Sequence, residues 1–265
     1  IDRPATDAVG MFGQTTNAVI KNLGLTNVSI NGKQAVGGLL GRAYTSTITG
    51  CYSTGSVTSS DWFVGGLAGV SYGSTISNCY SAASAISNEW FQGGLLGAGY
   101  ASGGNNTLIQ KSYSTGVVGT SAIVGGLVGK DYAVTVENSF WDKETSGKTS
   151  SDGGVGKTTS EMKTAATFTN AGWSTGIWNV VDNSYPTLKG PTPPNNQPTA
   201  LALSPSSVAE NQAPGTFVGE FNATDPDANS THLFSLVSGP GDDANPDFFI
   251  DANGTLRTAR SLNFE

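Results

Sequence analysis

The strings VGGLLG (36–41), VGGLAG (64–69), QGGLLG (92–97) and VGGLVG (124–129) repeat one pattern four times, and VGMFG (9–13) fits it with one glycine missing. Their last glycines lie 28, 28, 28 and 32 residues apart, at Gly13, Gly41, Gly69, Gly97 and Gly129. A fixed period of this size is typical of repeat architectures, in which each unit buries its apolar side against its neighbours. The repeat therefore predicts a structural scaffold.

Other residue types recur in the same register. Seven residues after the motif glycine come Ile20, Ile48, Ile76 and Val136, with Ile109 in the same role after an insertion at 101–106. Two residues further on, Asn recurs at Asn22, Asn78 and Asn138, and Asn tolerates the left-handed backbone of a corner. The motif glycines themselves are expected to allow positive φ at corners and close approach between coils.

These features favour β-structure, because each unit is rich in β-branched residues and has no apolar stripe of helical period. We expect an all-β fold that begins with a parallel β-solenoid of about five 28-residue coils over residues 1–141. At about 4.8 Å per coil, five coils would rise about 24 Å.

Composition limits the partners. The chain of 265 residues contains 36 Gly, and its charged fraction of 12% is about half the usual share. A net charge of −7 argues against nucleic acid and anionic membranes as main partners. No apolar run approaches the roughly 20 residues of a spanning helix. Because the chain begins at Ile1, we expect it to be a piece of something longer.

The motif also resembles a known repeat. The glycine string is followed by ITGCYSTGSV (48–57), ISNCYSAASA (76–85) and IQKSYSTGVV (109–118), and together they resemble the GLUG repeat of large secreted bacterial proteins. The resemblance covers about residues 9–141 and implies an adhesin-like protein of the bacterial cell surface. Residues 142–189 resemble the segment that often closes such arrays. We expect them to cap the open strand edges and to contain one short helix, over 160–167.

One column of residues on the solenoid could bind a ligand. Lys33, Asp61 and Glu89 each lie 20 residues after a motif glycine, and Trp62 with Trp90 and Phe63 with Phe91 run beside them. Three interpretations stay open: a plain rim, a carbohydrate-binding platform, or the paired carboxylates of a polysaccharide-degrading enzyme. Residues 9–140 hold only four acids, and the single His232 excludes the commoner His-based triads and zinc sites. We therefore expect no enzyme.

Three further patterns have a structural and a functional interpretation. Cys51 and Cys79 occupy one column in adjacent coils, where a disulfide is possible but a ladder of small core residues is favoured. The string GGVGKTT (153–159) lacks the first glycine of a phosphate-binding loop, because Ser151 stands in its place. Threonines align at Thr47, Thr75 and Thr135 as in ice-binding solenoids, although surface Thr in strands ordinarily reflects β-propensity.

The stretch GPTPPNNQP (190–198) predicts a stiff linker and a domain boundary. Beyond it, SSVAENQAPGTFVGEF (206–221), NATDPDANS (222–230) and FFIDANGTLRTARSLNFE (248–265) resemble a cadherin-like module, an antiparallel sandwich of the immunoglobulin type. The resemblance implies a calcium cofactor held by Glu210, Asp225, Asp227, Asn263 and Glu265. Asn263 replaces an acid of the family, so weaker binding is expected.

Residues 199–265 are fewer than the roughly 100 of a whole module. We expect an incomplete sandwich whose last strands are absent, with the missing strand supplied by more of the same chain or by another copy. The expected function is that of an extracellular structural or adhesive protein, a rigid scaffold joined to a calcium-binding module and a possible subunit of a surface filament. Its expected partners are other copies, neighbouring modules, surface glycans or a cell-surface receptor.

Overall fold

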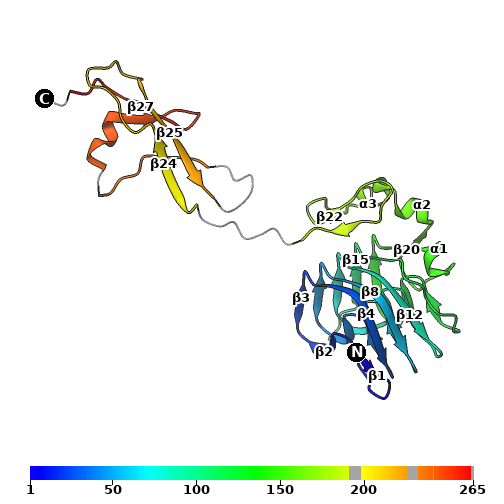
Figure 1. Cartoon of the computed structure of the whole chain (residues 1–265). Helices are drawn as coiled ribbons and strands as arrows, with labels where there is room; N and C mark the ends of the chain where they lie inside the picture. Colours follow the sequence, from blue (N-terminus) through cyan, green and yellow to red (C-terminus); the bar gives the residue numbers. More distant parts are fainter. Residues whose placement is uncertain (191–197, 226–231, 241, 264–265) are drawn as a thin grey trace. The chain divides into compact units, whose positions relative to one another are not determined.

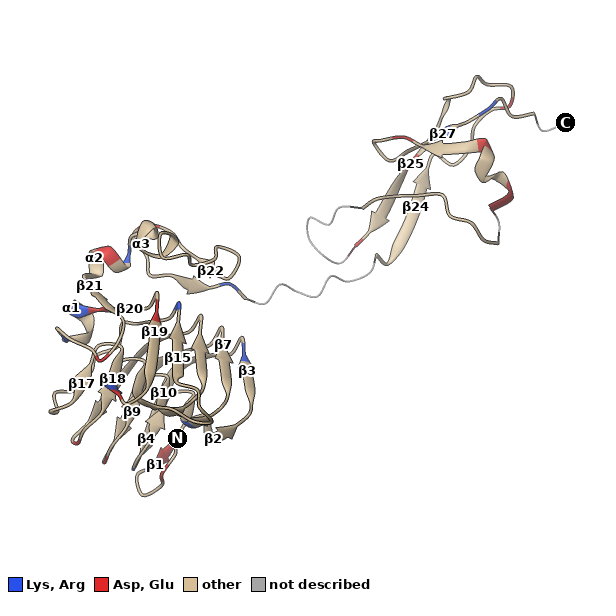
Figure 2. Cartoon of the chain, turned by 180° about the vertical axis from the view of Figure 1, so that it is seen from behind, with Lys and Arg blue, Asp and Glu red and all other residues tan. Residues whose placement is uncertain are grey.

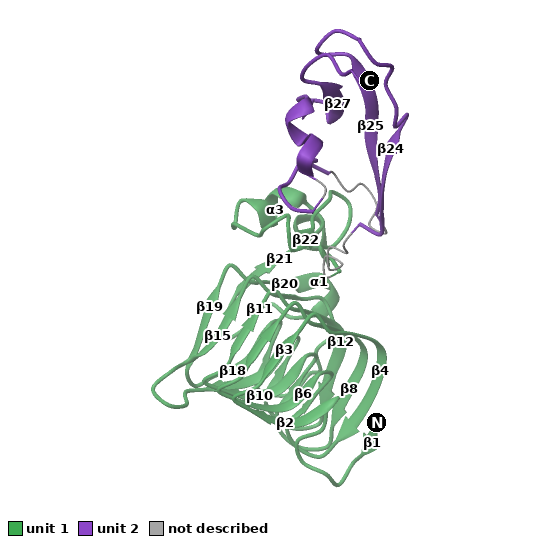
Figure 3. Ribbon diagram, turned by 90° about the vertical axis from the view of Figure 1, so that its left-hand side faces the viewer, with its two compact units in different colours: residues 1–191 green, residues 192–265 purple. Residues whose placement is uncertain are grey.

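The computed structural model describes residues 1–190, 198–225, 232–240 and 242–263. The chain divides into two compact units, Ile1–Pro191 and Thr192–Glu265, which Figure 3 shows in green and purple. Most of the linker expected at 190–198 lies outside the described residues.

Unit 1 is a solenoid whose coils contribute strands to four parallel sheets, with β4, β8 and β12 side by side in Figure 1. The first sheet contains β1 (Asp2–Arg3), β4 (Gly24–Gly32), β8 (Tyr52–Ser59), β12 (Tyr80–Ser87), β16 (Tyr113–Ser114), β20 (Phe140–Asp142) and β21 (Val155–Lys157). The second contains β2 (Phe12–Thr16), β6 (Leu40–Tyr44), β10 (Ala68–Tyr72), β14 (Leu96–Tyr100) and β18 (Val128–Asp131). The third contains β3 (Val19–Lys21), β7 (Thr47–Thr49), β11 (Thr75–Ser77), β15 (Thr107–Gln110) and β19 (Val134–Glu137). The fourth contains β5 (Val36–Gly37), β9 (Val64–Gly65), β13 (Gln92–Gly93) and β17 (Val124–Gly125).

The strand register confirms the predicted period. In the third sheet the direct neighbours are Ile20, Ile48, Ile76, Ile109 and Val136. The insertion at 101–106 leaves the coil as a small hairpin, in which Ser102 and Asn105 exchange backbone hydrogen bonds of 2.9 and 3.0 Å. The coils then pair again beyond it, so the extra residues change the spacing without disturbing the stack. Unit 1 is therefore the predicted parallel β-solenoid of about five coils.

The motif leucines fill the interior of the stack. Leu39, Leu67, Leu95 and Leu127 are all fully buried in one apolar cluster, and burying each contributes about 1.5–3 kcal/mol. The motif glycines serve close approach alone. A Cβ added at Gly69 would lie 2.5 Å from the carbonyl carbon of Ala35 and the nitrogen of Val36, while its φ is not positive. The expectation of positive φ at these glycines was wrong, because the chain turns elsewhere.

The turns lie where the recurring asparagines predicted them. Asn22, Asn78 and Asn138 have φ of 55°, 49° and 46°, and the equivalent Gly50 has 62°. Lys111 adopts φ of 47° at the same place, although lysine has no special tolerance for this backbone. The coil geometry therefore imposes the corner, and Asn and Gly reduce its cost.

After the first corner, which Leu23 follows, the residue after the corner is small, and from Cys79 onwards its side chain accepts a backbone hydrogen bond. The backbone N–H of Cys79 donates to Ser112 Oγ (3.1 Å), and that of Ser112 donates to Ser139 Oγ (3.1 Å). The N–H of Cys51 donates to Cys79 Sγ in the same way (3.4 Å). Both cysteines are buried free thiols, and burial raises the pKa of Cys79. The ladder of small core residues is thus confirmed over the disulfide.

The segment after the last coil covers its open edge. Strand β21 pairs in parallel with β20, and the N–H groups of Leu127 and Val128 donate to Ser151 Oγ (3.1 and 2.9 Å). The helix expected over 160–167 is two short helices, α2 (Thr159–Met162) and α3 (Ala165–Thr169), interrupted where Thr164 takes an extended backbone. A further helix, α1 (Lys143–Ser146), was not predicted.

The cap also covers one side of the coils, where β22 (Trp178–Asn179) and β23 (Thr187–Leu188) form a small antiparallel pair. Its core consists of Tyr113, Phe140, Met162, Phe168, Trp173 and Trp178. Three hydrogen bonds fix it to the solenoid: from Tyr113 OH to Pro186 O (2.6 Å), from Trp178 Nε1 to Asn78 Oδ1 (3.2 Å) and from Trp173 Nε1 to Asn138 O (2.9 Å). None of the helices in the described ranges is long and apolar enough to cross a membrane.

Unit 2 shows one antiparallel sheet in the order β24 (Ala200–Ser204), β25 (Phe217–Thr224), β27 (Thr255–Thr258) and β26 (Phe248–Ile250), with a 3₁₀ helix at Asp242–Asp247. This order corresponds to the A-B-E-D sheet of an immunoglobulin-type sandwich. No second sheet faces it within the described part of unit 2. The predicted sandwich is therefore not confirmed.

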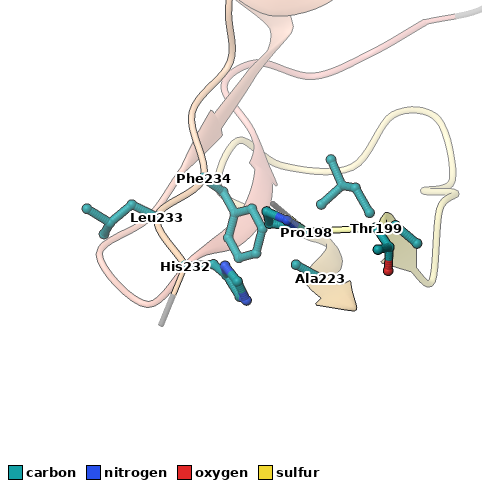
Figure 4. A pocket seen from close by; sticks show the side chains of 8 residues that line it. Pro198, Thr199, Ala223, His232, Leu233 and Phe234 are labelled. Carbon is teal, nitrogen blue, oxygen red and sulfur yellow. The ribbon is translucent and has the colours of Figure 1, made fainter. Parts of the chain in front are cut away.

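An open pocket of about 520 Å³ lies between β24 and the extended segment at 232–234 (Figure 4). Leu201, Ala223 and Phe234 line it. His232, also in its lining, lies 3.7 Å from a carboxylate oxygen of Asp225. Several large apolar side chains of the unit are exposed, with Leu201 at 64% and Leu233 completely so. The described sheet thus has an apolar surface that its own residues do not cover.

Candidate functional site

The predicted solenoid column forms as expected. Its backbone is joined across coils by hydrogen bonds from Asp61 N to Lys33 O (2.9 Å) and from Phe63 N to Trp90 O (3.3 Å). The loops that carry these residues connect β8 to β9 and β12 to β13. Figure 2 shows how sparse charge is over the solenoid's strands, most of which are drawn in tan. The Asp61 and Glu89 column is one of the few charged features of this surface.

The tryptophan column is exposed to solvent, whereas Phe63 is partly buried and Phe91 is buried. Trp62 and Trp90 are 39% and 46% exposed, whereas Phe91 is 6% exposed. The division arises at Phe63 and Phe91, whose φ of 64° and 65° turn the chain just after each tryptophan. Ala35 makes the same turn in the preceding coil with φ of 54°. The corner is therefore a property of every one of these coils. The exposed tryptophan beside it is present only in the second and third coils.

A tyrosine ladder beside this column was missed by the sequence analysis. Tyr44, Tyr72, Tyr100 and Tyr132 stack in adjacent coils with ring centroids 4.5, 5.0 and 4.5 Å apart. Each lies three residues after a motif glycine, so the period alone could have located them. Burial, together with the neighbouring rings of Tyr132 and Tyr72, raises the pKa of Tyr100 to about 12. The phenol of Tyr100 therefore stays neutral at physiological pH.

The ladder and the phenylalanines form one aromatic surface. Phe63 meets Tyr100 at 6.3 Å and Phe91 meets Tyr132 at 6.0 Å between ring centroids. Val70 and Ala98 are buried in the same apolar cluster as Phe91. The surface is thus anchored to the second sheet, and it holds the tryptophan loops against a rigid support.

The residues implied as calcium ligands fall into two groups. A hydrogen bond from Asn211 N to Leu262 O (2.7 Å) brings the neighbours Glu210 and Asn263 to one end of the unit 2 sheet. Asp225 follows the last residue of β25, at the sheet's other end, because β25 starts beside the end of β27. The seven residue steps of β25 span about 23 Å. The two groups therefore belong to opposite ends of the unit.

Asp227 and Glu265 lie outside the described residues. Within the described ranges, no group of three His, Cys, Asp or Glu residues is close enough together to hold a metal ion. The carboxylate of Asp225, whose side chain is 6% exposed, is near His232 instead.

The glycine-rich string at 153–159 has a structural role. Val155–Lys157 form β21, and Thr158 caps α2 through a capping box with Glu161. The N–H of Thr158 donates to Glu161 Oε2 (2.8 Å) and the N–H of Glu161 to Thr158 Oγ1 (3.2 Å). Its backbone donors are therefore committed to the cap of the solenoid.

Comparison with known proteins agrees with the repeat. A family model described as the GLUG motif matches residues 32–58. Over 85 residues the chain is 36% identical to a protein of Evansella cellulosilytica provisionally named as a Gly-rich membrane protein, an alignment covering 29% of this chain and 10% of that one. The chain thus spans about a tenth of that relative's length.

A solved structure from Bacteroides ovatus, provisionally named as an immunoglobulin A1 protease, is similar with a TM-score of 0.48 and 22% identity. The similarity covers 71% of this chain and 62% of that chain. Residues 32–58 thus carry a GLUG motif, within a parallel β-solenoid of about five coils.

Proposed function

We propose that this chain is a structural, adhesive part of a bacterial cell-surface protein. The observation that carries the proposal is the solenoid itself, whose coils pair in register across four sheets and whose last coil is closed by β21. Such a rod holds whatever it displays at a fixed position, because each coil is bonded to its neighbours along the stack. The GLUG motif and the Gly-rich membrane protein among its relatives support a surface location.

A non-catalytic role agrees with the candidate residues. Asp61 and Glu89 stand in one column with Lys33, in the loops between strands. The N–H of Asp61 donates to Lys33 O (2.9 Å) and that of Glu89 to Ser87 Oγ (3.0 Å), which are ordinary structural contacts. A polysaccharide-degrading enzyme would need these two carboxylates to take different roles as acid and nucleophile or base. Loss of glycan cleavage in an Asp61→Asn variant, if any cleavage were detected, would contradict the non-catalytic assignment.

The surface location can be tested on intact cells that express the full-length protein. Antibodies raised against residues 1–189 should label unpermeabilised cells, and their Fab fragments should reduce attachment of those cells to their substratum. An antibody to a cytoplasmic protein serves as the control. Labelling that requires permeabilisation would contradict the surface assignment, and labelling without any effect on attachment would contradict adhesion alone.

We further propose that unit 2 is a cadherin-like module that binds calcium. The sheet order β24-β25-β27-β26 supports the module, and the grouping of Glu210 with Asn263, away from Asp225, supports two half-sites that neighbouring modules complete. Calcium bound only to the folded unit should raise its melting temperature. The unit has no tryptophan, so its melting is followed by calorimetry. The measurement uses a chain extended past Glu265 by a neighbouring module, which can complete the half-sites, with Glu210→Gln as the matched variant. Identical melting with calcium and with chelator would overturn the calcium proposal.

The exposed apolar residues of unit 2 support assembly into a filament through this sheet, with a second copy as the cover. Sedimentation of the full chain should show association that depends on concentration, and Leu233→Glu should abolish it. A monomer at all concentrations would contradict the filament.

A second candidate function is glycan binding by the solenoid. One observation favours it: Trp62 and Trp90 are both exposed and lie parallel within 6° on adjacent coils.

A further inference from the structure

The orientation of the tryptophan rings separates them from every other aromatic pair on this face. Phe63 and Phe91 have centroids 5.0 Å apart and planes within 12° of each other. Two parallel rings whose centroids are this near each other must overlap face to face, because rings lying side by side in one plane would clash at the same centroid distance. The tyrosine ladder is stacked in the same way. The faces of these rings are therefore covered by their neighbours along the stack.

The tryptophans are turned across this stack. The plane of Trp62 makes 88° with that of Phe63, and the plane of Trp90 makes 89° with that of Phe91. Because the phenylalanine faces point along the coil stack, the indole faces point largely across it. The two indoles are parallel within 6° with centroids 6.0 Å apart. They form a parallel pair on adjacent coils, named here the tryptophan platform, in which the two residues are 39% and 46% exposed.

Buried hydrogen bonds fix the loops that carry the platform. The Oγ of Ser59 donates to Lys33 O (2.6 Å), and that of Ser87 donates to Asp61 O (2.6 Å). The side-chain amide of Gln92, which is completely buried, donates to Ser87 O and Glu89 O (2.9 and 3.0 Å). Both loops are thereby ordered before any ligand arrives, which lowers the entropic cost of binding.

Polar groups border the platform. Asp61 and Glu89 each precede a tryptophan, so their carboxylates can accept hydrogen bonds along one side. In the coil before Trp62, the equivalent position is held by Gln34, whose Oε1 accepts from Arg42 Nη2 (3.4 Å). In the coil after Trp90, Ser121 accepts a hydrogen bond from Gln92 (2.6 Å). Flat apolar faces edged by acceptors and donors match a sugar ring, whose C–H face is apolar and whose hydroxyls lie at its rim.

We propose that the tryptophan platform binds a neutral β-linked polysaccharide that runs along the coil stack, with two consecutive pyranose rings each on one indole. A β-linked chain of equatorial hydroxyls is extended and flat, so it can cover two indoles side by side, whereas an α-linked chain coils away. The two carboxylates at the rim repel uronic acids and sulfated sugars. This inference rests on the second candidate function and specifies its ligand.

The test is calorimetric titration of the full chain with three oligosaccharides: cellohexaose, maltohexaose and hexagalacturonate. Cellohexaose should bind at least tenfold more tightly than the other two. Trp62→Ala and Trp90→Ala should each weaken that binding at least tenfold. Each variant also loses ring contacts with the phenylalanines, so circular dichroism must show that it keeps the wild-type fold at the titration temperature. The control is Tyr132→Ala, which removes an exposed aromatic residue of the same face outside the platform and should leave binding unchanged.

The outcomes distinguish the ligand from the function. If maltohexaose or hexagalacturonate bound best through the same tryptophans, glycan binding would stand and the proposed ligand would be overturned. If none of the three bound at millimolar concentration, or if the Trp62→Ala and Trp90→Ala double variant bound as well as the wild type, both would be overturned. The scaffold role would be unaffected in either case.

Discussion

Replacing Ser112 by alanine should destabilise the solenoid far more than its small change in volume suggests. The hydroxyl of this fully buried residue accepts from the N–H of Cys79 (3.1 Å) and donates to Gln110 O (2.9 Å). The carbonyl keeps another donor, Asn78 N at 3.0 Å, whereas the N–H of Cys79 would be left buried without a partner. An orphaned donor of this kind costs about 1–3 kcal/mol.

The matched control is Ser112→Cys. A thiol at this position in the two preceding coils already makes the equivalent contacts, as Cys79 does with the N–H of Cys51. We therefore expect Ser112→Cys to lower the free energy of unfolding by at least about 1 kcal/mol less than Ser112→Ala does, because the thiol remains as a weak acceptor. The comparison separates the hydrogen bond from the loss of polarity alone.

The assay is equilibrium unfolding in urea, monitored by tryptophan fluorescence. All five tryptophans lie in unit 1, so the signal reports the solenoid and its cap alone. A loss of 1 kcal/mol should lower the melting temperature of a unit this size by about 2–4 °C. If the alanine and cysteine variants unfolded at the same urea concentration, the hydrogen bonds from backbone N–H groups to these side chains would not be the reason why small residues occupy this column.

Two further predictions follow from the packing and the charges of unit 1. Gly69→Ala should lower the free energy of unfolding by at least about 3 kcal/mol, because its Cβ would lie 2.5 Å from backbone atoms of the preceding coil. The control Gly103→Ala, in open space at φ of 59°, should cost about 1–2 kcal/mol. Equal costs in urea unfolding would refute close approach as the reason for the motif glycine. Burial alone would raise the pKa of Asp142, but hydrogen bonds led by that from the Tyr185 hydroxyl (2.6 Å) outweigh it and hold the pKa below its ordinary 3.8. The ionised carboxylate therefore stabilises the cap above that pH, so Asp142→Asn should cost about 1–3 kcal/mol at pH 7 and progressively less as the pH falls below 4; a cost independent of pH would contradict this.

The period made the solenoid predictable. Residues that lie 28 apart are side by side in a coil stack, so Ile20, Ile48 and Ile76 could be placed together without knowing any side-chain conformation. The asparagine corners were predictable for the same reason. The tyrosine ladder could also have been found this way, since Tyr44 and Tyr72 keep a constant offset from the motif glycines.

The remaining features depend on contacts that no period encodes. The cap folds along the side of the coils because Trp178 and Tyr113 find partners there, and these are single contacts between segments far apart in sequence. The choice between Trp62 and Phe63 as the exposed ring depended on a left-handed backbone at a phenylalanine, which residue type alone does not predict. The face-on orientation of the indoles likewise follows only from the angles between rings.

The claim on which everything depends is that equivalent side chains of adjacent coils lie directly beside one another. Ser77 Oγ donates to Thr49 Oγ1 at 3.1 Å, so cysteines at these two positions are within reach of a disulfide. In a background of Cys51→Ser and Cys79→Ser, the pair Thr49→Cys with Ser77→Cys should cross-link completely under mild oxidation, as measured by mass spectrometry. The pair Thr47→Cys with Ser77→Cys, two residues out of register, should stay reduced; cross-linking of both pairs to the same extent, or of the second alone, would contradict the account.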